Sequence, residues 1–387
     1  MTASKKPNFR RFLSLWTCVL AGLAGSGPSH ASDANIYAYV GTRTTKERNA
    51  RGEGLSVYRV DARGHWTRVQ LMSDLVNPSF LIVDSSQRHL YAVHGDRSEV
   101  SSFAIDAANG QLKFLNQQST NGKNPVHLAI DPSHRFLLVA NYATGSIASL
   151  PINADGSLAP VVALAAFPGE PGPHKTQQTS SHPHQIVFDS TGQFVISPDK
   201  GLDRVFSYRL NPTDGTLLPG PTPFVAGREG SGTRHIAFHP AGSFAYVMNE
   251  LDSSVTTYSW KASEGALKPL QILPTAPANF TGNNTGAGIV IGNSGKFVYG
   301  SNRGHDSIAI YRVDQSQGTL ASIGWQASGG KGPRFITIAP DGKTLYAANE
   351  NSDTITQFRI DQANGSLTPF GEAIAVGSPV SIVFARY

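Results

Sequence analysis

Cysteine is almost absent from this sequence. Its 387 residues include one cysteine, Cys18, which lies in a short apolar segment near the N-terminus. A chain that loses this segment has no thiol, so disulfide bonds, thiolate metal sites and a cysteine nucleophile are excluded for it. The absence of cysteine is consistent with an oxidising compartment.

Long hydrophobic runs are also scarce. The apolar run Phe12–Gly25 follows four basic residues and precedes small residues at Ser29 and Ala31. This pattern predicts a cleaved secretory signal at residues 1–31, one domain at residues 32–387, and a periplasmic or secreted protein. An uncleaved membrane anchor is the alternative, but the run is shorter than the roughly 20 residues that a spanning helix requires.

Charge is sparse, at 15% of residues, and the formal net charge of +5 comes largely from the predicted signal. Residues 1–31 hold four basic and no acidic residues, so the rest of the chain has 28 basic and 27 acidic residues. This near-neutral remainder has no run rich in lysine or arginine. We therefore expect no nucleic-acid partner, no membrane span after signal cleavage, and a monomer.

An internal repeat of roughly 50 residues dominates what is present, and such a period is typical of solenoids and propellers. Each unit contains four short strands separated by turn signals. The units begin at Pro78, Pro125, Pro183, Thr233, Gly286, Pro333 and Pro379. Turns between the third and fourth strands lie at Asn109-Gly110, Asp155-Gly156, Asp214-Gly215, Glu264-Gly265, Gln317-Gly318 and Asn364-Gly365.

The seventh unit retains one strand, Val380–Ala385, before the chain ends. The three missing strands lie at the other end of the chain, at Ile36–Thr42, Gly54–Val60 and Trp66–Leu71. A sheet built from both ends closes a ring and protects its edges. The sequence therefore predicts an all-β, seven-bladed β-propeller, with a long loop at Pro160–Ser181.

Residues that recur at equivalent positions have structural explanations. Aromatic residues on the strands are predicted to pack between blades: Tyr37, Tyr58, Phe103, Phe206, Tyr258, Tyr311 and Phe358. Four asparagines near the ends of second strands are predicted to serve in turns: Asn141, Asn249, Asn302 and Asn349.

Positions that differ between units are better candidates for function. The residue after each unit start lies next to the central channel, and these residues are Ser79, Val126, His184, Arg234, Ala287, Arg334 and Val380. The residue that ends each second strand shares the same rim, because adjacent strands run antiparallel. Those residues are Gly95, Tyr142, Lys200, Glu250, Arg303 and Glu350.

Several spaced motifs carry a resemblance to a known family. They include His182-Pro183-His184-Gln185, Gly232-Thr233-Arg234-His235, Asn249-Glu250-Leu251, Ser301-Asn302-Arg303-Gly304 and Gly332-Pro333-Arg334. With the repeat, they resemble the lactonase family of seven-bladed propellers, which contains 6-phosphogluconolactonases and carboxymuconate cyclase. The resemblance implies catalytic residues at His184, Arg234, Glu250 and Arg303. Departures from the usual family residues occur at Gly95, Lys200 and Gly288.

The implied residues suit the opening of a lactone. Arg234 and Arg303 are able to stabilise the oxyanion that forms when water attacks the carbonyl carbon. Glu250 or His184 takes the proton from water, and the sequence does not choose between them. The other rim residues assigned to substrate binding are Arg334, Lys200, Glu350, His182 and Tyr142.

No cofactor or metal is expected. His182 and His184 lie two residues apart, as expected for a metal pair on one face of a strand, but no third ligand has a supporting spacing. Neither a Gly-x-Ser-x-Gly elbow nor a glycine-rich phosphate loop is present, so a serine-triad hydrolase is not expected.

The expected partner is a small anionic or sugar lactone, and the expected function is 6-phosphogluconolactonase-like hydrolysis. Two alternatives remain open. One is a catalytically silent propeller that binds a small anionic ligand or scaffolds partners, because a fold does not determine a function. The other is a cyclase that acts on a dicarboxylic lactone. Secretion makes an unphosphorylated aldonolactone plausible as well, since 6-phosphogluconolactone is a cytoplasmic metabolite, and the sequence does not choose between the two.

Overall fold

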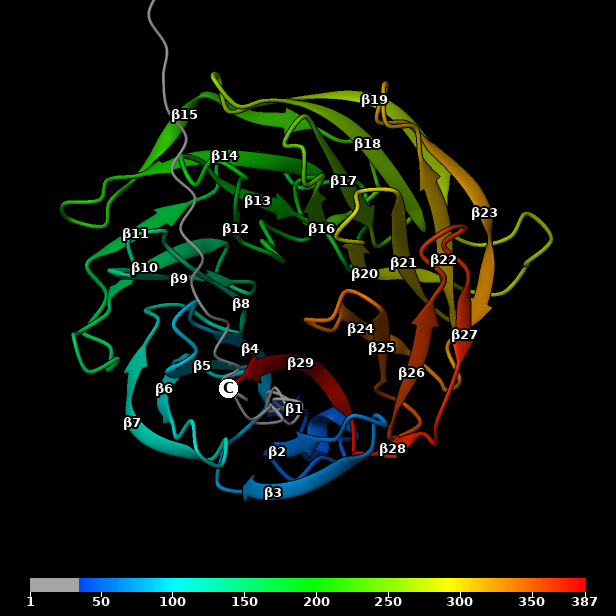
Figure 1. Ribbon diagram of the computed structural model, residues 1–387. Helices are drawn as coiled ribbons and strands as arrows, with labels where there is room; N and C mark the ends of the chain where they lie inside the picture. Colours follow the sequence, from blue (N-terminus) through cyan, green and yellow to red (C-terminus); the bar gives the residue numbers. More distant parts are fainter. Residues whose placement is uncertain (1–34) are drawn as a thin grey trace, which may run out of the picture. The chain divides into compact units, whose positions relative to one another are not determined.

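The computed structural model describes residues 35–387, so the predicted signal at residues 1–31 lies outside the described residues. Within the described part, seven antiparallel sheets form a ring of blades, and the first strand of each blade lies nearest the centre (Figure 1). This arrangement confirms the predicted all-β, seven-bladed propeller. Among residues 35–387, no helix is long and apolar enough to cross a bilayer.

Six blades contain four strands, and one contains five. From the centre outward, the first three blades along the chain are β4 (Pro78–Val83), β5 (His89–His94), β6 (Glu99–Ile105) and β7 (Leu112–Ser119); β8 (Pro125–Ile130), β9 (Phe136–Asn141), β10 (Ser146–Pro151) and β11 (Ala163–Ala166); and β12 (Val187–Phe188), β13 (Val195–Asp199), β14 (Arg204–Leu210) and β15 (Leu217–Ala226). The next three are β16 (Thr233–Phe238), β17 (Phe244–Asn249), β18 (Ser254–Lys261) and β19 (Ala266–Pro274); β20 (Thr285–Ile291), β21 (Phe297–Arg303), β22 (Ser307–Val313) and β23 (Leu320–Ala327); and β24 (Pro333–Ile338), β25 (Thr344–Asn349), β26 (Thr354–Ile360) and β27 (Leu367–Pro369), with β28 (Ile374–Ala375) also paired to β26. The last blade is β29 (Pro379–Arg386), β1 (Ile36–Thr42), β2 (Leu55–Val60) and β3 (Trp66–Met72). A short 3-10 helix, η1 (Lys46–Arg48), follows β1.

The last blade joins the two ends of the chain. Strand β29 pairs antiparallel with β1, from Ile36 opposite Arg386 to Thr42 opposite Pro379. Strands β2 and β3 complete this blade. The predicted closure is therefore confirmed, and it pairs the free edge that β29 would otherwise leave at the centre of the ring.

Aromatic residues between blades form the core. All seven aromatic residues predicted to pack there are buried. A second set of tyrosines joins four of the blades to the next blade through a hydroxyl group, and these are Tyr39, Tyr91, Tyr246 and Tyr299. For example, the Tyr39 hydroxyl donates to the Gly110 carbonyl at 2.9 Å, and the Tyr246 hydroxyl donates to the Gly318 carbonyl at 3.0 Å. Both glycines have a φ of 71°, in the left-handed region that these hairpin turns require.

The second and third units each depart from the predicted strand pattern in one place. The predicted loop at Pro160–Ser181 contains strand β11, which pairs with β10. Its alanines have a weak preference for strands, but an edge strand needs only the backbone hydrogen bonds of its neighbour. Strand β12 is limited to Val187–Phe188, so His182 and His184 lie in irregular backbone before it, and not on one face of a strand.

Asparagines at the ends of the second strands have a structural role, as predicted. The Asn249 amide donates to Ser254 and Thr256, and the Asn349 amide donates to Thr354 and Thr356. These bonds join the end of each second strand to the start of the third. The residue after each asparagine is therefore held at the rim of the channel.

Candidate active site

One cavity lies where the innermost strands begin. Six of the seven residues predicted to lie next to the channel line it: Ser79, Val126, His184, Arg234, Arg334 and Val380. Its other lining residues are Arg43, Phe80, His235 and Phe335. The cavity volume is about 20 Å³, which is room for one water-sized group. A larger ligand therefore has to lie at the mouth and extend only a small group inward.

Glu250 forms ion pairs with three cations from three blades. Its Oε1 atom lies 2.9 Å from Lys200 Nζ and 3.3 Å from Arg303 Nη2, and its Oε2 atom lies 2.9 Å from Arg234 Nε. Burial by itself raises the pKa of the Glu250 carboxyl. The three cations outweigh burial, Arg303 most strongly, and hold this pKa well below its usual range. Glu250 is therefore a carboxylate at neutral pH.

Arg234 is the largest fully buried side chain, with 2% of its surface exposed. Its Nη1 atom donates to the Ala287 carbonyl at 2.7 Å and contacts His235 Nε2 at 3.3 Å. Because arginine only donates, Nε2 of His235 is the acceptor in this contact. Burial lowers the pKa of Arg234, and the nearby charge of Arg303 lowers it further.

His184 packs edge-on against two aromatic rings. Its ring centroid lies 5.5 Å from that of Tyr142 and 5.1 Å from that of His235. Burial lowers the pKa of His184 well below its usual value, and the charges of Arg234 and Arg334 add to this effect. The imidazole is therefore neutral at pH 7. Its Nδ1 atom is buried without a hydrogen-bond partner among residues 35–387.

Tyr142, His182 and Lys200 meet beside His184. The rings of Tyr142 and His182 stack at 4.5 Å, and Lys200 Nζ lies 5.6 Å from the centre of the Tyr142 ring. Lys200 also donates to Gln177 Oε1 at 2.7 Å. The irregular segment before β12 therefore contributes a side chain to the site, and the sequence analysis did not identify it.

Arg334 and Glu350 lie on another part of the rim. Arg334 Nε and Glu350 Oε2 are 3.8 Å apart, and about a fifth of each side chain is exposed. Arg334 lines the same cavity as His184 and Arg234. The structure thus brings all nine predicted site residues to one end of the channel, around one cavity and the ion-pair cluster beside it.

The comparisons with known proteins agree with this arrangement. The family described as "Lactonase, 7-bladed beta-propeller" matches residues 37–384. The chain belongs to this lactonase family.

Named relatives agree in activity. A 6-phosphogluconolactonase of Bacillus subtilis is 34% identical over 76% of this chain and 83% of its own length. A 6-phosphogluconolactonase of Formosa agariphila is 31% identical over 78% of this chain and 85% of its own length. The structure of a periplasmic gluconolactonase of Pseudomonas aeruginosa has a TM-score of 0.82 and 31% identity, covering 91% of this chain and 98% of that one. The protein is a lactone hydrolase.

Two polar residues of the lactonase cavity, His235 and Arg43, went unassigned in the sequence analysis. His235 follows Arg234 in a quoted motif, but its place in the cavity was not inferred. Arg43 follows strand β1, which is the second strand of the closing blade. It is therefore the counterpart of Glu250 and Glu350, and the rule that selected those residues identifies Arg43 once it is applied to the closing blade.

The described part of this lactonase has no evident metal centre. Among residues 35–387, no three His, Cys, Asp or Glu side chains gather so as to hold a metal ion. His182, one half of the metal pair considered from the sequence, has its Nδ1 atom 3.0 Å from the Tyr142 carbonyl oxygen.

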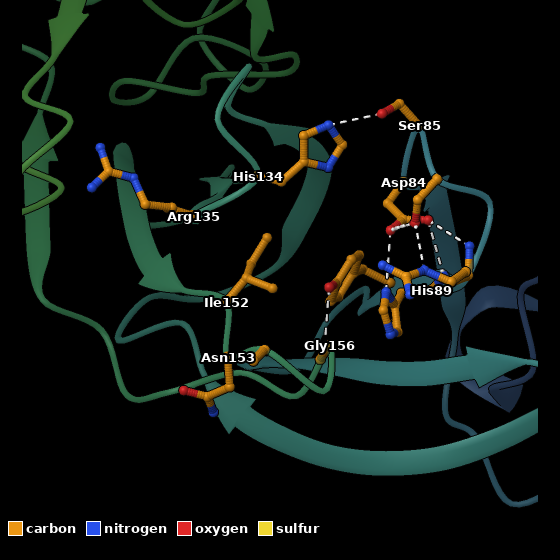
Figure 2. Close-up of a pocket in the computed structure, with 12 residues that line it drawn as sticks. Asp84, Ser85, His89, His134, Arg135, Ile152, Asn153 and Gly156 are labelled. Carbon is orange, nitrogen blue, oxygen red and sulfur yellow. Dashed lines mark hydrogen bonds and ion pairs between the residues drawn. The ribbon is translucent and has the colours of Figure 1, made fainter.

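A larger groove of about 580 Å³ lies at the opposite ends of the strands, between the β4–β7 and β8–β11 blades. Figure 2 shows His134 pointing toward Ser85, with the Ser85 hydroxyl and His134 Nε2 2.8 Å apart. It also shows Asp84 beside His89, whose Nδ1 atom lies 3.1 Å from the carboxylate. Ser85, His134 and Asp84 lie in turns between strands, His89 begins β5, and no predicted site residue lies here.

Proposed function

We propose that this lactonase adds water to a sugar lactone of the gluconolactone type, at the end of the channel where the cavity opens. The observation that carries this proposal is that a neutral imidazole, His184, lines the same cavity as Arg234, whose guanidinium is paired with the Glu250 carboxylate. A reaction that develops negative charge on oxygen needs fixed positive charge, and a proton acceptor that is free at neutral pH.

The charge at this end of the channel favours an oxyanion. The ion pairs of the rim residues, of Arg43 and of its partner Asp96 contain six cations and three carboxylates, namely Arg43, Arg48, Lys200, Arg234, Arg303, Arg334, Asp96, Glu250 and Glu350. The excess of positive charge suits the carbonyl oxygen during attack and the carboxylate of the product. Arg303 is the best placed for this role, because its side chain is 19% exposed whereas that of Arg234 is 2% exposed.

His184 is the proton carrier in this mechanism. The neutral imidazole takes a proton from the attacking water while the water oxygen bonds to the carbonyl carbon. The tetrahedral oxyanion then collapses, the ring C–O bond breaks, and the imidazolium returns the proton to the leaving oxygen. Glu250 serves as the counter-ion that keeps Lys200, Arg234 and Arg303 in place, because both of its carboxylate oxygens are already engaged by these cations.

The identity of the lactone rests on the relatives. Proteins similar to this chain are named 6-phosphogluconolactonase, and one solved structure is titled a periplasmic gluconolactonase. The N-terminal segment predicted to be a secretory signal agrees with the latter. We therefore place the protein outside the cytoplasm, with a gluconolactone as its substrate.

A substrate panel tests the proposal. The purified protein is assayed by pH-stat with glucono-δ-lactone, 6-phosphogluconolactone and carboxymuconolactone, and the spontaneous rate is subtracted. Each assay is repeated with a chelator. We expect hydrolysis of at least one gluconolactone, with a rate that the chelator leaves unchanged. Activity on carboxymuconolactone alone, loss of activity with the chelator, or no activity on any of the three contradicts the proposal.

A further inference from the structure

The connection between the second and third blades is the longest connection between blades in the described chain. It occupies residues 167–186, from the end of β11 to the start of β12, whereas the corresponding connections after β7 and β15 occupy residues 120–124 and 227–232. A short connection is enough to pass from the outer strand of one blade to the inner strand of the next. The extra segment at residues 168–181, which we call the strap, is therefore not required by the repeated fold.

The strap is fixed against the rim of the channel. The backbone amide of Gly172 donates to the Gly201 carbonyl at 2.8 Å. The side chain of Gln178, which is 2% exposed, donates through Nε2 to the Lys200 carbonyl at 2.9 Å. Lys200 and Gly201 directly follow β13, the second strand of the third blade. These bonds therefore place the strap beside the ion-pair cluster of Glu250.

Gln177 is the strap residue whose side chain reaches this cluster. Its Oε1 atom accepts a hydrogen bond from Lys200 Nζ at 2.7 Å, and the same Nζ atom lies 2.9 Å from Glu250 Oε1. Because lysine only donates, the oxygen of the Gln177 amide faces Lys200 and the NH₂ group is turned away from it. Gln177 is exposed, and its Nε2 atom has no hydrogen-bond partner among residues 35–387. An amide donor of fixed orientation is thus available at the mouth of the channel.

The small cavity places the ring of a sugar lactone near this donor. The cavity has room for one water-sized group, so the hydroxyl-bearing ring has to lie outside it, at the mouth. Arg303, the proposed partner of the carbonyl oxygen, has its Nη2 atom 3.3 Å from the same Glu250 oxygen that Lys200 contacts. A ring whose carbonyl oxygen meets Arg303 therefore has the side chains of Lys200 and Gln177 as neighbours.

An amide held in one orientation suits the recognition of a hydroxyl group. Ordering a free glutamine side chain costs conformational entropy, and the bond to Lys200 removes much of this cost before a ligand arrives. A site that hydrogen-bonds a substrate hydroxyl also discriminates against the analogue that lacks it. Gln177 is therefore placed to distinguish a sugar lactone from a lactone without hydroxyl groups.

We propose that Gln177 is a sugar-recognition residue of this lactonase, whose Nε2 atom donates to a hydroxyl on the ring of the bound lactone while Lys200 holds Oε1. This inference rests on the proposed hydrolysis of a sugar lactone at the same mouth. Gln177 takes no part in proton transfer, so it acts on the hydroxyl groups of the ligand and not on the lactone group. A glutamine that served only to support Lys200 would affect every ligand alike.

Two open-chain acids of equal charge test this role without any turnover. Isothermal titration calorimetry of the full protein compares gluconate with 5-hydroxypentanoate, which has one carboxylate and lacks the ring-derived secondary hydroxyls. We expect the parent protein to bind gluconate more tightly. Gln177→Met keeps the length of the side chain without a hydrogen-bonding group, and should reduce the affinity ratio about fivefold, as the loss of one neutral hydrogen bond implies.

Gln362→Met is the matched control. Gln362 is also exposed, but it lies in the turn after β26, at the opposite ends of the strands from the cavity. This variant should keep the affinity ratio of the parent protein. Thermal unfolding checks that both variants fold.

Steady-state kinetics add a second readout on whichever gluconolactone the protein hydrolyses. Loss of a contact that holds the sugar equally in the ground state and the transition state raises KM and leaves kcat unchanged. We expect this pattern for Gln177→Met. A fall in kcat at constant KM would show that Gln177 acts through Lys200 on the reacting groups, and it would overturn the inference.

The binding outcomes also separate this inference from the proposed function. Absence of a preference for gluconate in the parent protein, an unchanged ratio in Gln177→Met, or an equal loss of affinity for both acids overturns sugar recognition by Gln177, even if lactones are hydrolysed. A preference that depends on Gln177 supports it, and does so even in a protein that hydrolyses no lactone, where the proposed function fails.

Discussion

The two ends of the blades contain similar residue types in different surroundings. At the cavity end, His184, Arg234 and Glu250 are buried. At the groove end, shown in Figure 2, His134 and Arg135 are exposed and Asp84 is buried. The residue types at each end therefore do not distinguish an active site from a set of turns.

The two ends differ in where the hydrogen-bond and ion-pair partners of their charged residues come from. At the groove end, each aspartate serves its own turn: Asp84 accepts from the backbone of Arg88 and His89, and Asp131 accepts from that of Arg135 and Phe136. At the cavity end, Glu250 pairs with side chains from three different blades. Hydrogen bonds within one turn recur from blade to blade. Ion pairs between side chains of different blades depart from the repeat, and only these ion pairs gather charge around a cavity.

The sharpest test of this comparison replaces one histidine at each end. His184→Asn removes the proposed proton carrier, so kcat/KM for the preferred lactone should fall by roughly 10²–10⁴. His134→Asn removes an exposed histidine whose partner is a surface serine, and should leave kcat/KM unchanged. Steady-state kinetics at neutral pH measure both. Equal losses in the two variants would contradict the distinction between the two ends.

A second, smaller effect concerns stability. Glu250→Gln preserves shape but leaves Lys200 and Arg234 buried without a counter-ion, which should lower the free energy of unfolding by about 3 kcal/mol. Glu53→Gln removes a carboxylate from an exposed pair with Arg68 and serves as the control. It should produce no measurable change. Urea denaturation at pH 7 checks both values, and a fully stable Glu250→Gln would mean that the cluster is not tightly coupled.

The smallest of the three effects is the pH dependence of stability. His127 packs on Phe80 in the channel, with ring centroids 3.8 Å apart, and burial lowers its pKa to about 3. The unfolded chain binds a proton to His127 near its ordinary pKa, so this histidine reduces stability as the pH falls from about 6.5 toward 3.

Replacing His127 isolates its contribution to this pH dependence. When the pH falls from 6 to 4, the free energy of unfolding should fall by about 2 kcal/mol less in His127→Gln than in the parent protein. His65→Gln, at an exposed histidine on the surface, is the control. Urea denaturation across this pH range measures the difference, and parallel curves for His127→Gln and the parent protein would show that His127 is not buried as a neutral group.

The sequence by itself determined the architecture. Its repeat predicted seven blades, and the single strand left at the seventh start predicted closure by the N-terminal strands. Both predictions rest on local patterns that recur, and β29 on β1 confirms them. The errors fell at the end of the second unit and the start of the third. In the second unit, the alanine-rich β11 is held by pairing with β10 and not by its own preference for strands.

The sequence also selected the rim. Comparing equivalent positions identified His184, Arg234, Glu250 and Arg303 as unlike their counterparts, because a residue that departs from a repeat is not required by the repeated fold. Arg43 escaped that comparison only because its blade is built from both ends of the chain.

Only the tertiary structure decided how these residues interact. Which cations neutralise Glu250 and which imidazole stays neutral both depend on burial and on distances between blades. Those distances are absent from any local pattern, since Lys200, Glu250 and Arg303 lie roughly 50 residues apart along the chain and meet only when their neighbouring blades pack together. The proposed proton carrier therefore follows from the packing of the blades around the channel.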